Sequence, residues 1–363
     1  MTRRPMARDG QTEATKRLGL RHPVIQGPFG GGLSTTRLVA AVSNAGGLGS
    51  YGAHVLAPDE ITKTASEIRS LTGEPFALNL WISDHDPGGL RVTAAEYTRV
   101  AGLFRPYFRE LGLDVPPAPP QFSPSYDEQI EALLEARPPV FSFVFGIPSP
   151  AVVEECRRRD IVTVGAATTV DEALALDEAK VDLIVATGFE AGGHRPSFLA
   201  RAEDSLMGTF VLTQLVSSRV RAPVIAAGGI ADRRGVDAAL VLGAQAAQIG
   251  TAFLACEESG ATDEHRALLF GQKTSTTTLT RAFTGRLARG LRNRWTDEMR
   301  PLLAELPPFP VQSWFVSQLK RAAVDAKRTD LVSLWAGQIA PNLRHHDAAS
   351  LMHSLTTPQE NTS

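Results

Sequence analysis

The chain has 363 residues, 43% of them hydrophobic and 21% charged, with a formal net charge of −2 at pH 7. This length suffices for one large barrel or two ordinary domains, and the near-neutral charge gives no electrostatic basis for binding nucleic acid or an anionic membrane. The sequence has no run of about 20 uninterrupted apolar residues, which excludes a simple membrane-spanning helix.

Short apolar runs alternate with helical patterns along the chain, starting at residue 23. The expected strands are 23–26, 48–49, 76–79, 140–145, 161–164, 183–186, 224–227 and 247–249. The expected helices are 35–44, 58–71, 150–159, 170–177, 205–216 and 232–242. Eight strands with helices between them predict an α/β fold of the (β/α)₈ TIM-barrel type. A doubly wound sheet fits less well, because the early glycines lack the G-x-G-x-x-G spacing.

The barrel is expected over residues 17–264, with an insertion at about 83–125 after the third strand. Residues 265–343 are longer than a closing helix requires, and we expect a helical, lid-like extension that covers the active site and completes the barrel. Residues 1–16 lack the apolar core of a secretory signal and are expected to be disordered. Residues 344–363 are expected to form a polar tail.

The two cysteines, Cys156 and Cys256, lie far apart and lack the spaced partners of a zinc site. We therefore predict no metal ion and no disulfide, and a reducing, cytoplasmic location. The sequence does not determine the oligomeric state, and a homodimer is compatible with it.

A glycine pair followed by an imidazole comes shortly after the sixth strand, as Gly192-Gly193-His194. Two glycines allow a sharp turn and the close approach of a flat ligand. Histidine has the side-chain pKa nearest to neutral pH and is the commonest proton shuttle. His194 is therefore the candidate catalytic residue, and its neighbour Arg195 is a weaker candidate for the substrate pocket.

Other strand ends supply candidate ligand contacts, because barrel enzymes bind at the carboxyl face. The first strand ends in Gln26-Gly27-Pro28 and leads to Phe29 and three glycines, a wall with few side chains. Asn79 and Thr187 end the third and sixth strands and can donate or accept hydrogen bonds. Near these ends, Phe29 and His54 are weaker candidates for the substrate pocket.

Glycine-bearing turns follow the seventh and eighth strands, as Gly228-Gly229 and as Gln248-Ile249-Gly250-Thr251. Loops at these two positions, with helix N-termini behind them, form the usual phosphate site of this fold. A phosphate clamp, an amide and a glycine-lined wall together predict a bound flavin mononucleotide (FMN).

The chain resembles the nitronate monooxygenases, formerly called 2-nitropropane dioxygenases, from about residue 20 to about residue 343. Five ordered motifs carry the resemblance: 22–28 with 33–35 and 40–49, 188–195, 227–230 with 248–251, 281–286, and 334–338. The resemblance implies an FMN-dependent TIM-barrel enzyme that oxidises alkyl nitronates, and possible nitroalkane substrates, with O₂ to a carbonyl compound and nitrite. It assigns FMN contacts to Gln26, Gly27, Pro28, Asn79, Gly192, Gly229 and 248–251, and the role of active-site base to His194.

Four positions depart from the family pattern. Phe29 stands where many relatives have methionine, and Thr187 where a glutamine often contacts FMN. Val144 replaces a histidine of some relatives, and Pro196 replaces a glycine after the base. These departures bear on the substrate more than on the cofactor.

Three alternatives remain open at this stage. The first two are a flavin-dependent enoyl-thioester reductase and an NADH:quinone reductase on the same scaffold. The third is a non-catalytic barrel that binds a phosphate ligand, which would leave His194 without a role. The cluster Arg286, Arg289, Arg292 and Arg294 has two readings: contact with an anionic ligand, or salt bridges on a solvated face.

Overall fold

The structure is a computed structural model that describes residues 11–82, 85–89, 91–271 and 276–357. Eight parallel strands form one sheet in the order β1-β9-β8-β6-β5-β4-β3-β2. Their bounds are Val24–Gln26 (β1), Gly49–Gly52 (β2), Phe76–Trp81 (β3), Val140–Val144 (β4), Val162–Ala167 (β5), Leu183–Thr187 (β6), Val224–Ala227 (β8) and Ala246–Ile249 (β9). All eight predicted strands are present, and β2, β3 and β5 run two or three residues beyond their predicted ends.

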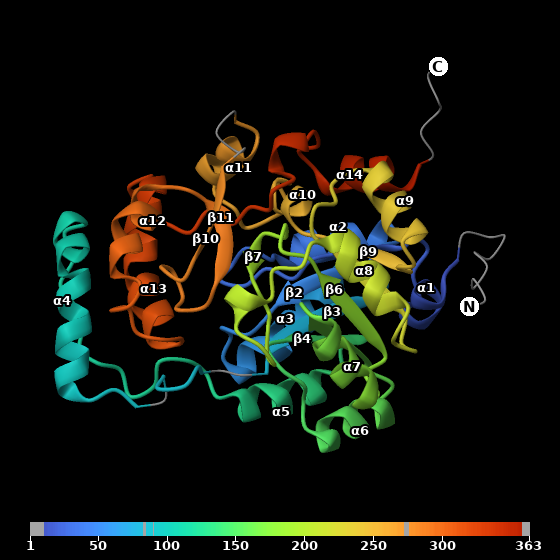
Figure 1. Cartoon of the computed structure of the whole chain (residues 1–363), viewed down its shortest axis with the longest axis horizontal. Coiled ribbons are helices and arrows are strands. Elements are labelled where there is room, and N and C mark those ends of the chain that lie inside the picture. Colours follow the sequence, from blue (N-terminus) through green and yellow to red (C-terminus); the bar gives the residue numbers. More distant parts are fainter. Residues whose placement is uncertain (1–10, 83–84, 90, 272–275, 358–363) are drawn as a thin grey trace.

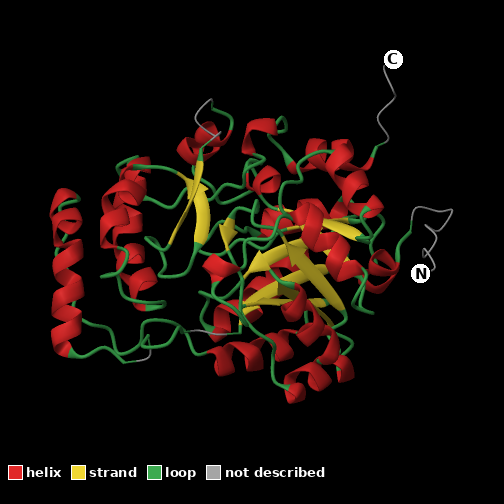
Figure 2. Cartoon of the chain, viewed as in Figure 1, coloured by secondary structure: helices red, strands yellow, loops and turns green. Residues whose placement is uncertain are grey.

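Contacts between β1 and the segment that enters β2 bring the two ends of the sheet together. Ile25 and Leu48 form a parallel bridge, and the Gln26 amide donates to the Leu48 carbonyl at 2.9 Å. The Gln26 side chain adds to this seam, because its Oε1 accepts from the Ser50 amide at 2.8 Å. The eight strands thus form the predicted TIM barrel (Figure 2).

Eight helices follow the strands and surround the barrel (Figure 1). They are α2 (Thr36–Asn44), α3 (Pro58–Leu71), α5 (Tyr126–Ala136), α6 (Pro150–Arg158), α7 (Val170–Glu178), α8 (Thr209–Ser217), α9 (Arg233–Val241) and α14 (Ala348–Thr356). Most begin at a side-chain cap, such as Thr35 for α2 and Asp232 for α9, which satisfies backbone donors of the first turn.

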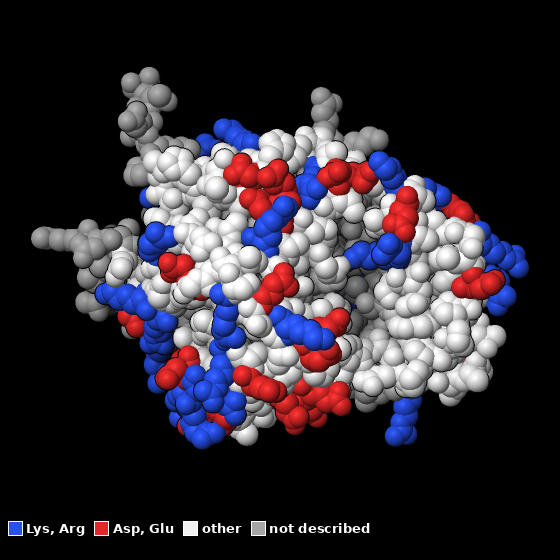
Figure 3. All heavy atoms as spheres, turned by 180° about the vertical axis from the view of Figure 1, so that it is seen from behind, with Lys and Arg blue, Asp and Glu red and all other residues white. Residues whose placement is uncertain are grey.

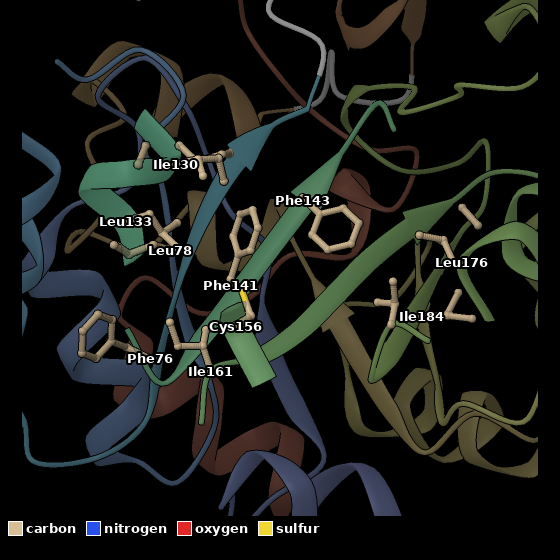
Figure 4. Packing of buried hydrophobic residues seen from close by; sticks show 14 of the residues in the cluster. Phe76, Leu78, Ile130, Leu133, Phe141, Phe143, Cys156, Ile161, Leu176 and Ile184 are labelled. Carbon is tan, nitrogen blue, oxygen red and sulfur yellow. The ribbon is translucent and has the colours of Figure 1, made fainter. Parts of the chain in front are cut away.

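Apolar side chains fill the space between the strands and these helices. Figure 4 shows Phe141 and Phe143 of β4 among residues of α5, α6 and the neighbouring strands. Because both faces of a parallel barrel are covered, its strands are mostly apolar and show no regular alternation of polar and apolar residues. The exceptions include Gln26, Asn79 and Gln248, which lie at or near the carboxyl ends of β1, β3 and β9. This core holds the carboxyl ends of the strands, and therefore the site above them, in fixed positions.

The expectation that residues 1–16 are disordered is wrong for residues 12–16, whereas residues 1–10 lie outside the described residues. Thr12 caps helix α1 (Glu13–Leu18), and Thr12 and Thr15 form a reciprocal capping box. Ala14 and Leu18 are buried against the side chains that fill the amino end of the barrel. Helix α1 therefore closes that end of the barrel.

The expectation of a polar tail at 344–363 is wrong for residues 348–356, which form α14; residues 358–363 lie outside the described residues. Asp347 caps this helix, and Ala348, Leu351, Met352 and Leu355 are buried against α2, α9 and β9. The apolar spacing i, i+3, i+4 and i+7 is that of an amphipathic helix. The eighth barrel helix is therefore separated from β9 by the whole C-terminal extension.

The insertion after β3 and the C-terminal extension share a second hydrophobic core at one side of the barrel. The insertion supplies α4 (Ala94–Glu110); residues 83, 84 and 90 of it lie outside the described residues. The extension supplies α12 (Arg294–Met299) and α13 (Val311–Asp325), while α10 (Thr251–Leu254) and α11 (Asp263–Leu269) lie between β9 and this core. Phe104 of α4 stacks on Phe315 of α13, and Trp295 is completely buried between them and Phe283. In Figure 1 helices α4, α12 and α13 stand side by side, away from the barrel.

A small antiparallel sheet that the sequence did not predict connects the extension to the barrel. Strands β10 (Thr277–Thr280) and β11 (Ala288–Leu291) pair with each other, and β11 also pairs with β7 (Gly193–His194). The predicted histidine thus belongs to a strand, and its backbone is held by a segment about 95 residues further along the chain, as the pair Ala288–His194 shows.

Basic and acidic side chains are interspersed on the face drawn in Figure 3. In the described parts of the chain, no helix is long and apolar enough to cross a membrane.

Candidate active site

A cavity of about 360 Å³ lies at the carboxyl ends of the strands, within the size range of small-molecule and cofactor pockets. The loops after β1, β2, β6, β8 and β9 and the carboxyl ends of β3, β4 and β5 line it, together with α13 and the segment 332–337 of the extension. Most of the predicted site residues line this cavity: Gly27, Pro28, Phe29, His54, Asn79, Thr187, Gly192, Gly193, His194, Gly228, Gly229, Gln248, Gly250 and Thr251.

Three predicted site residues do not line the cavity. The side chain of Gln26 is buried in the seam between β1 and β2, where Ser50 and its own neighbour Gly27 use the amide. Ile249 points into the core between β9, α2 and α14. Arg195 is 1% exposed, and its guanidinium donates to the carbonyls of Thr187 at 3.0 Å, Gly188 at 2.7 Å and Ser205 at 2.6 Å.

Arg195 was predicted as a substrate contact, and the structure corrects this. The two terminal nitrogens of its guanidinium donate to three backbone carbonyl oxygens, whereas Nε has no hydrogen-bond partner among the described residues, and the side chain does not line the cavity. The residue therefore fixes the loop that carries the glycine pair and His194.

The glycine pair is required by the approach of the extension and by the local turn. A Cβ on Gly192 would lie 2.5 Å from the amide nitrogen of Gly337, so a side chain would push the extension away. Gly193 has φ +74°, which L-residues rarely adopt, and a Cβ there would meet nothing within 4 Å. The turn is therefore open toward the cavity on one side and packed tightly on the other.

The imidazole of His194 is held by one hydrogen bond and by several rings. Its Nε2 lies 2.8 Å from the hydroxyl of Thr284, and its ring contacts Trp81 and Trp335 with centroids 4.9 Å and 5.3 Å apart. Among the described residues, Nδ1 has no hydrogen-bond partner. This nitrogen is therefore the one that remains for a ligand.

The hydroxyl of Thr284 is compatible with both neutral tautomers of His194. It can donate to the Arg286 carbonyl, at 3.3 Å, while it accepts from Nε2–H; it can equally donate to Nε2. In the first arrangement Nδ1 presents a lone pair to the cavity, and in the second it presents an N–H. The same imidazole can thus accept a proton from a substrate or donate a hydrogen bond to it.

Burial, and to a smaller extent the nearby charge of Arg286, lower the pKa of His194 to about 3. The histidine is therefore neutral at neutral pH. Arg286 itself is 5% exposed and pairs with Asp86 of the insertion at 2.9 Å. Its guanidinium lies over the rings of Phe145 and Phe309 at 4.1 Å and 4.2 Å.

The arginine cluster thus divides into two kinds. Arg286 and Arg289 are buried, and Arg289 donates to the Phe189 carbonyl at 3.0 Å. Arg292 and Arg294 form ion pairs near the surface, with Asp297 at 2.6 Å and Glu110 at 2.7 Å respectively. The interpretation as salt bridges on a solvated face is therefore confirmed for Arg292 and Arg294 and is wrong for Arg286 and Arg289.

Two tryptophans that the sequence did not single out as site residues line the cavity beside His194: Trp81 and Trp335. Trp81 lies two residues after Asn79 on β3, so both side chains point to the same face of the sheet. The predicted strand ended at Asn79, so Trp81 was not recognised as a residue on the same face of the strand. Trp335 lies in the extension, and only the tertiary structure brings it to the site.

The turns after β8 and β9 have the backbone geometry of an anion site. Gly228 and Gly229 have φ values of +110° and +70°, and the helix that follows is capped by Asp232. The Thr251 hydroxyl accepts from the Gly337 amide at 2.9 Å, which leaves its own proton free to donate. Among the described residues that line the cavity there is no aspartate or glutamate, so an anion would meet no opposing carboxylate.

Asn79 donates to the Ser142 hydroxyl at 3.0 Å through Nδ2. Within the described part of the chain no hydrogen bond reaches its Oδ1, which can therefore accept from a ligand.

Lys320 of α13 also lines the cavity, and its ammonium donates to the Gly31 carbonyl at 2.6 Å. This bond connects the extension to the glycine loop after β1.

A cofactor-sized cavity above a (β/α)₈ barrel, with a histidine on one wall and glycine turns on another, defines an enzyme site of this fold. Comparison with known proteins specifies the class further. The sequence model of the nitronate monooxygenase family matches residues 11–357. A probable nitronate monooxygenase of Staphylococcus aureus (strain JH9) is 36% identical over 342 residues, which are 94% of this chain and 95% of that protein.

Comparison with solved structures gives relatives of the same kind. A nitroalkane oxidase from Streptomyces ansochromogenes superposes with a TM-score of 0.85 at 35% identity, covering 94% of this chain and 96% of that one. FabK from Thermotoga maritima gives a TM-score of 0.74 at 28% identity, covering 95% and 94%. The chain belongs to the nitronate monooxygenase family, a family of flavin-dependent oxidoreductases.

Proposed function

We propose that this enzyme uses FMN to oxidise alkyl nitronates with O₂ to a carbonyl compound and nitrite. The observation that carries the proposal is the imidazole of His194, whose Nδ1 has no hydrogen-bond partner among the described residues, in a cavity that no described carboxylate lines. Such a wall accepts the negative charge of a nitronate and of a cofactor phosphate alike.

The residues that line the cavity fit FMN. The amides of Gly228, Gly229 and Gly250 and the Thr251 hydroxyl would bind the phosphate, because glycine turns bring N–H groups close to an anion. Asn79 Oδ1 would accept from the isoalloxazine, and Gly27 and Gly192 would form the walls against it. When bound, FMN supplies the redox chemistry, accepting electrons from the organic substrate and passing them to O₂.

His194 has a different task for each form of the substrate. A neutral nitroalkane must lose a Cα proton, which the lone pair of Nδ1 would accept. A nitronate has already lost that proton, and Nδ1–H would donate to one of its oxygens. Burial lowers the pKa of His194, so the imidazole starts neutral and can serve either form of the substrate.

Anaerobic mixing of the yellow holoenzyme with propionate 3-nitronate tests the proposal. We expect the flavin absorbance to bleach rapidly, with NADH in a separate sample giving no bleaching. The reverse result would contradict the proposal and favour a nicotinamide-dependent reductase acting on enoyl thioesters or quinones. Absence of flavin from the purified protein would favour a non-catalytic barrel.

The role of His194 has its own test, the substitution His194→Asn. Asparagine can still donate a hydrogen bond but accepts no proton, so turnover of nitroethane should fall by a larger factor than turnover of ethylnitronate. Steady-state kcat/KM for both substrates measures this difference. Equal losses on the two would show that His194 is not the base.

A further inference from the structure

A second imidazole lines the same cavity, and the proposed reaction does not yet use it. His54 follows β2, and its ring stacks on Trp81 with centroids 3.8 Å apart and planes 7° from parallel. Trp81 also contacts His194. The two histidines therefore contact the same indole, and each contributes to the cavity wall.

The loop after β1 is shaped around the ring of His54. A Cβ on Gly30 would lie 2.0 Å from its Cε1 and 2.9 Å from each ring nitrogen, a distance that no side chain tolerates. The backbone of His54 is held as well, because its carbonyl accepts from Gln129 of α5 at 3.0 Å. The ring is therefore held between Gly30 and Trp81, and helix α5 holds the backbone that carries it.

The two nitrogens of His54 have different surroundings. Nδ1 is buried and has no hydrogen-bond partner among the described residues, whereas the residue as a whole lines the cavity. Burial, with contributions from His194 and Arg286, lowers the pKa of His54 well below its usual value, so the ring carries one proton. A buried N–H without a partner is rarer in proteins than a buried acceptor without one. The proton therefore belongs on Nε2, which is the nitrogen left to meet a ligand.

We propose that His54 is a substrate-binding residue that donates Nε2–H to an oxygen of the bound anion, beside His194. The inference rests on the proposed function for the identity of that anion as a nitronate. It assigns to His54 a contribution to affinity and orientation, with no proton transfer.

The test uses the FMN holoenzyme and two probes: nitrite, which undergoes no turnover, and ethylnitronate. His54→Phe keeps a flat ring on Trp81 and removes the donor; His54→Gln keeps an N–H donor. Val55→Ala is the matched control, because Val55 lines the same cavity from the next position and has no polar side-chain atom. Calorimetric titration gives the Kd for nitrite, and steady-state kinetics separate KM from kcat for ethylnitronate.

We expect His54→Phe to raise the Kd for nitrite and the KM for ethylnitronate about tenfold, which corresponds to one hydrogen bond to an anion, with kcat changed less than threefold. His54→Gln should recover most of the affinity, and Val55→Ala should bind as the wild type does. Unchanged nitrite affinity in His54→Phe would overturn the proposal.

One further outcome separates this inference from the proposed function. If the wild type oxidises no nitronate but its nitrite affinity still depends on His54, the anion site stands and the proposed reaction fails.

If His54→Phe does not fold, Gly30→Ala provides the second variant, since its new methyl group displaces the His54 ring. Gly30→Ala should weaken nitrite binding about as much as the loss of the donor does, and wild-type affinity in Gly30→Ala would count against the inference.

Discussion

At the scale of single residues, the site depends on which atom of each polar group is already used. Thr284 occupies Nε2 of His194 and leaves Nδ1 without a partner among the described residues. Ser142 occupies Nδ2 of Asn79 and leaves Oδ1. Arg195, which the sequence suggested as a ligand contact, has its guanidinium occupied by backbone carbonyls. Sequence motifs identify residues of the right type, but hydrogen bonding decides which of their atoms can do chemistry.

Thr284→Val tests whether the threonine positions His194. Valine has the same shape but no hydroxyl, so neither tautomer of the imidazole is stabilised at Nε2. We expect kcat for nitroethane to fall about tenfold, equivalent to about 1.4 kcal/mol, and its pH profile to change shape. Thr284→Ser, which keeps the hydroxyl, should restore most of the rate.

Ser317→Ala is the control for this prediction, because Ser317 also lines the cavity while its hydroxyl donates within α13 to Trp314. Its kcat and pH profile should match the wild type. A Thr284→Val enzyme with an unaltered pH profile would show that Thr284 has only a packing role.

At the scale of elements, the site is assembled from two parts of the chain that are far apart in sequence. The barrel strands and the loops after them supply the glycine turns, His54 and, from β3 itself, Asn79. The extension supplies Thr284, Trp335 and Lys320, and its strand β11 pairs with the strand that carries His194. The insertion supports this arrangement from outside, through the packing of α4 on α13 and the ion pair between Asp86 and Arg286.

Helix α14 gives a prediction about stability at this scale. Leu351 is 1% exposed and packs in the cluster between α2, α9 and β9. Leu351→Ala should therefore lower the free energy of unfolding by about 2–5 kcal/mol, the usual range for a buried leucine. Denaturant unfolding of the purified variant measures this loss.

His353→Ala, on the exposed face of the same helix, is the matched control and should change the stability by less than about 0.5 kcal/mol. If Leu351→Ala unfolded at the same denaturant concentration as the wild type, α14 would not be the closing helix of the barrel.

At the scale of the whole molecule, three histidines couple the stability of the fold to pH: His265, which is buried, and His54 and His194, which are half-buried in the cavity wall. Burial lowers the pKa of His194 to about 3, that of His265 to about 4, and that of His54 well below its usual value. Each of them is neutral when folded and takes up a proton when it unfolds at a pH below the ordinary histidine value of about 6.5. The unfolded state then binds more protons than the folded state, so stability falls as the pH is lowered.

We expect the free energy of unfolding to be constant above about pH 7 with respect to these groups. It should decrease between pH 6.5 and pH 5, by roughly 1 kcal/mol per histidine for the first pH unit. Urea unfolding at pH 7.5 and pH 5.5 measures the difference. His265→Gln should reduce the pH dependence, whereas His353→Gln, at an exposed position, should not. A pH dependence that is the same in both variants would exclude His265 as a contributor.

The sequence by itself determined the barrel, most of its ligand-facing loops and the position of the candidate base. These features are local: the strands are short, mostly apolar runs, glycine directly follows β1, β6, β8 and β9, and parallel strands place their carboxyl ends on one face. The helices at either end of the chain were missed. The apolar stripe of α14 is only nine residues long, and polar segments surround it.

Only the tertiary structure decided how the site is completed. The pairing of β7 with β11, the contact of Trp335 with His194 and the aromatic surroundings of Arg286 join segments that are distant in sequence. No local pattern encodes such contacts, because they depend on how the second core of α4, α12 and α13 packs beside the barrel. The residue types at the site could be recognised from the sequence, but their burial, their partners and their protonation follow from this packing.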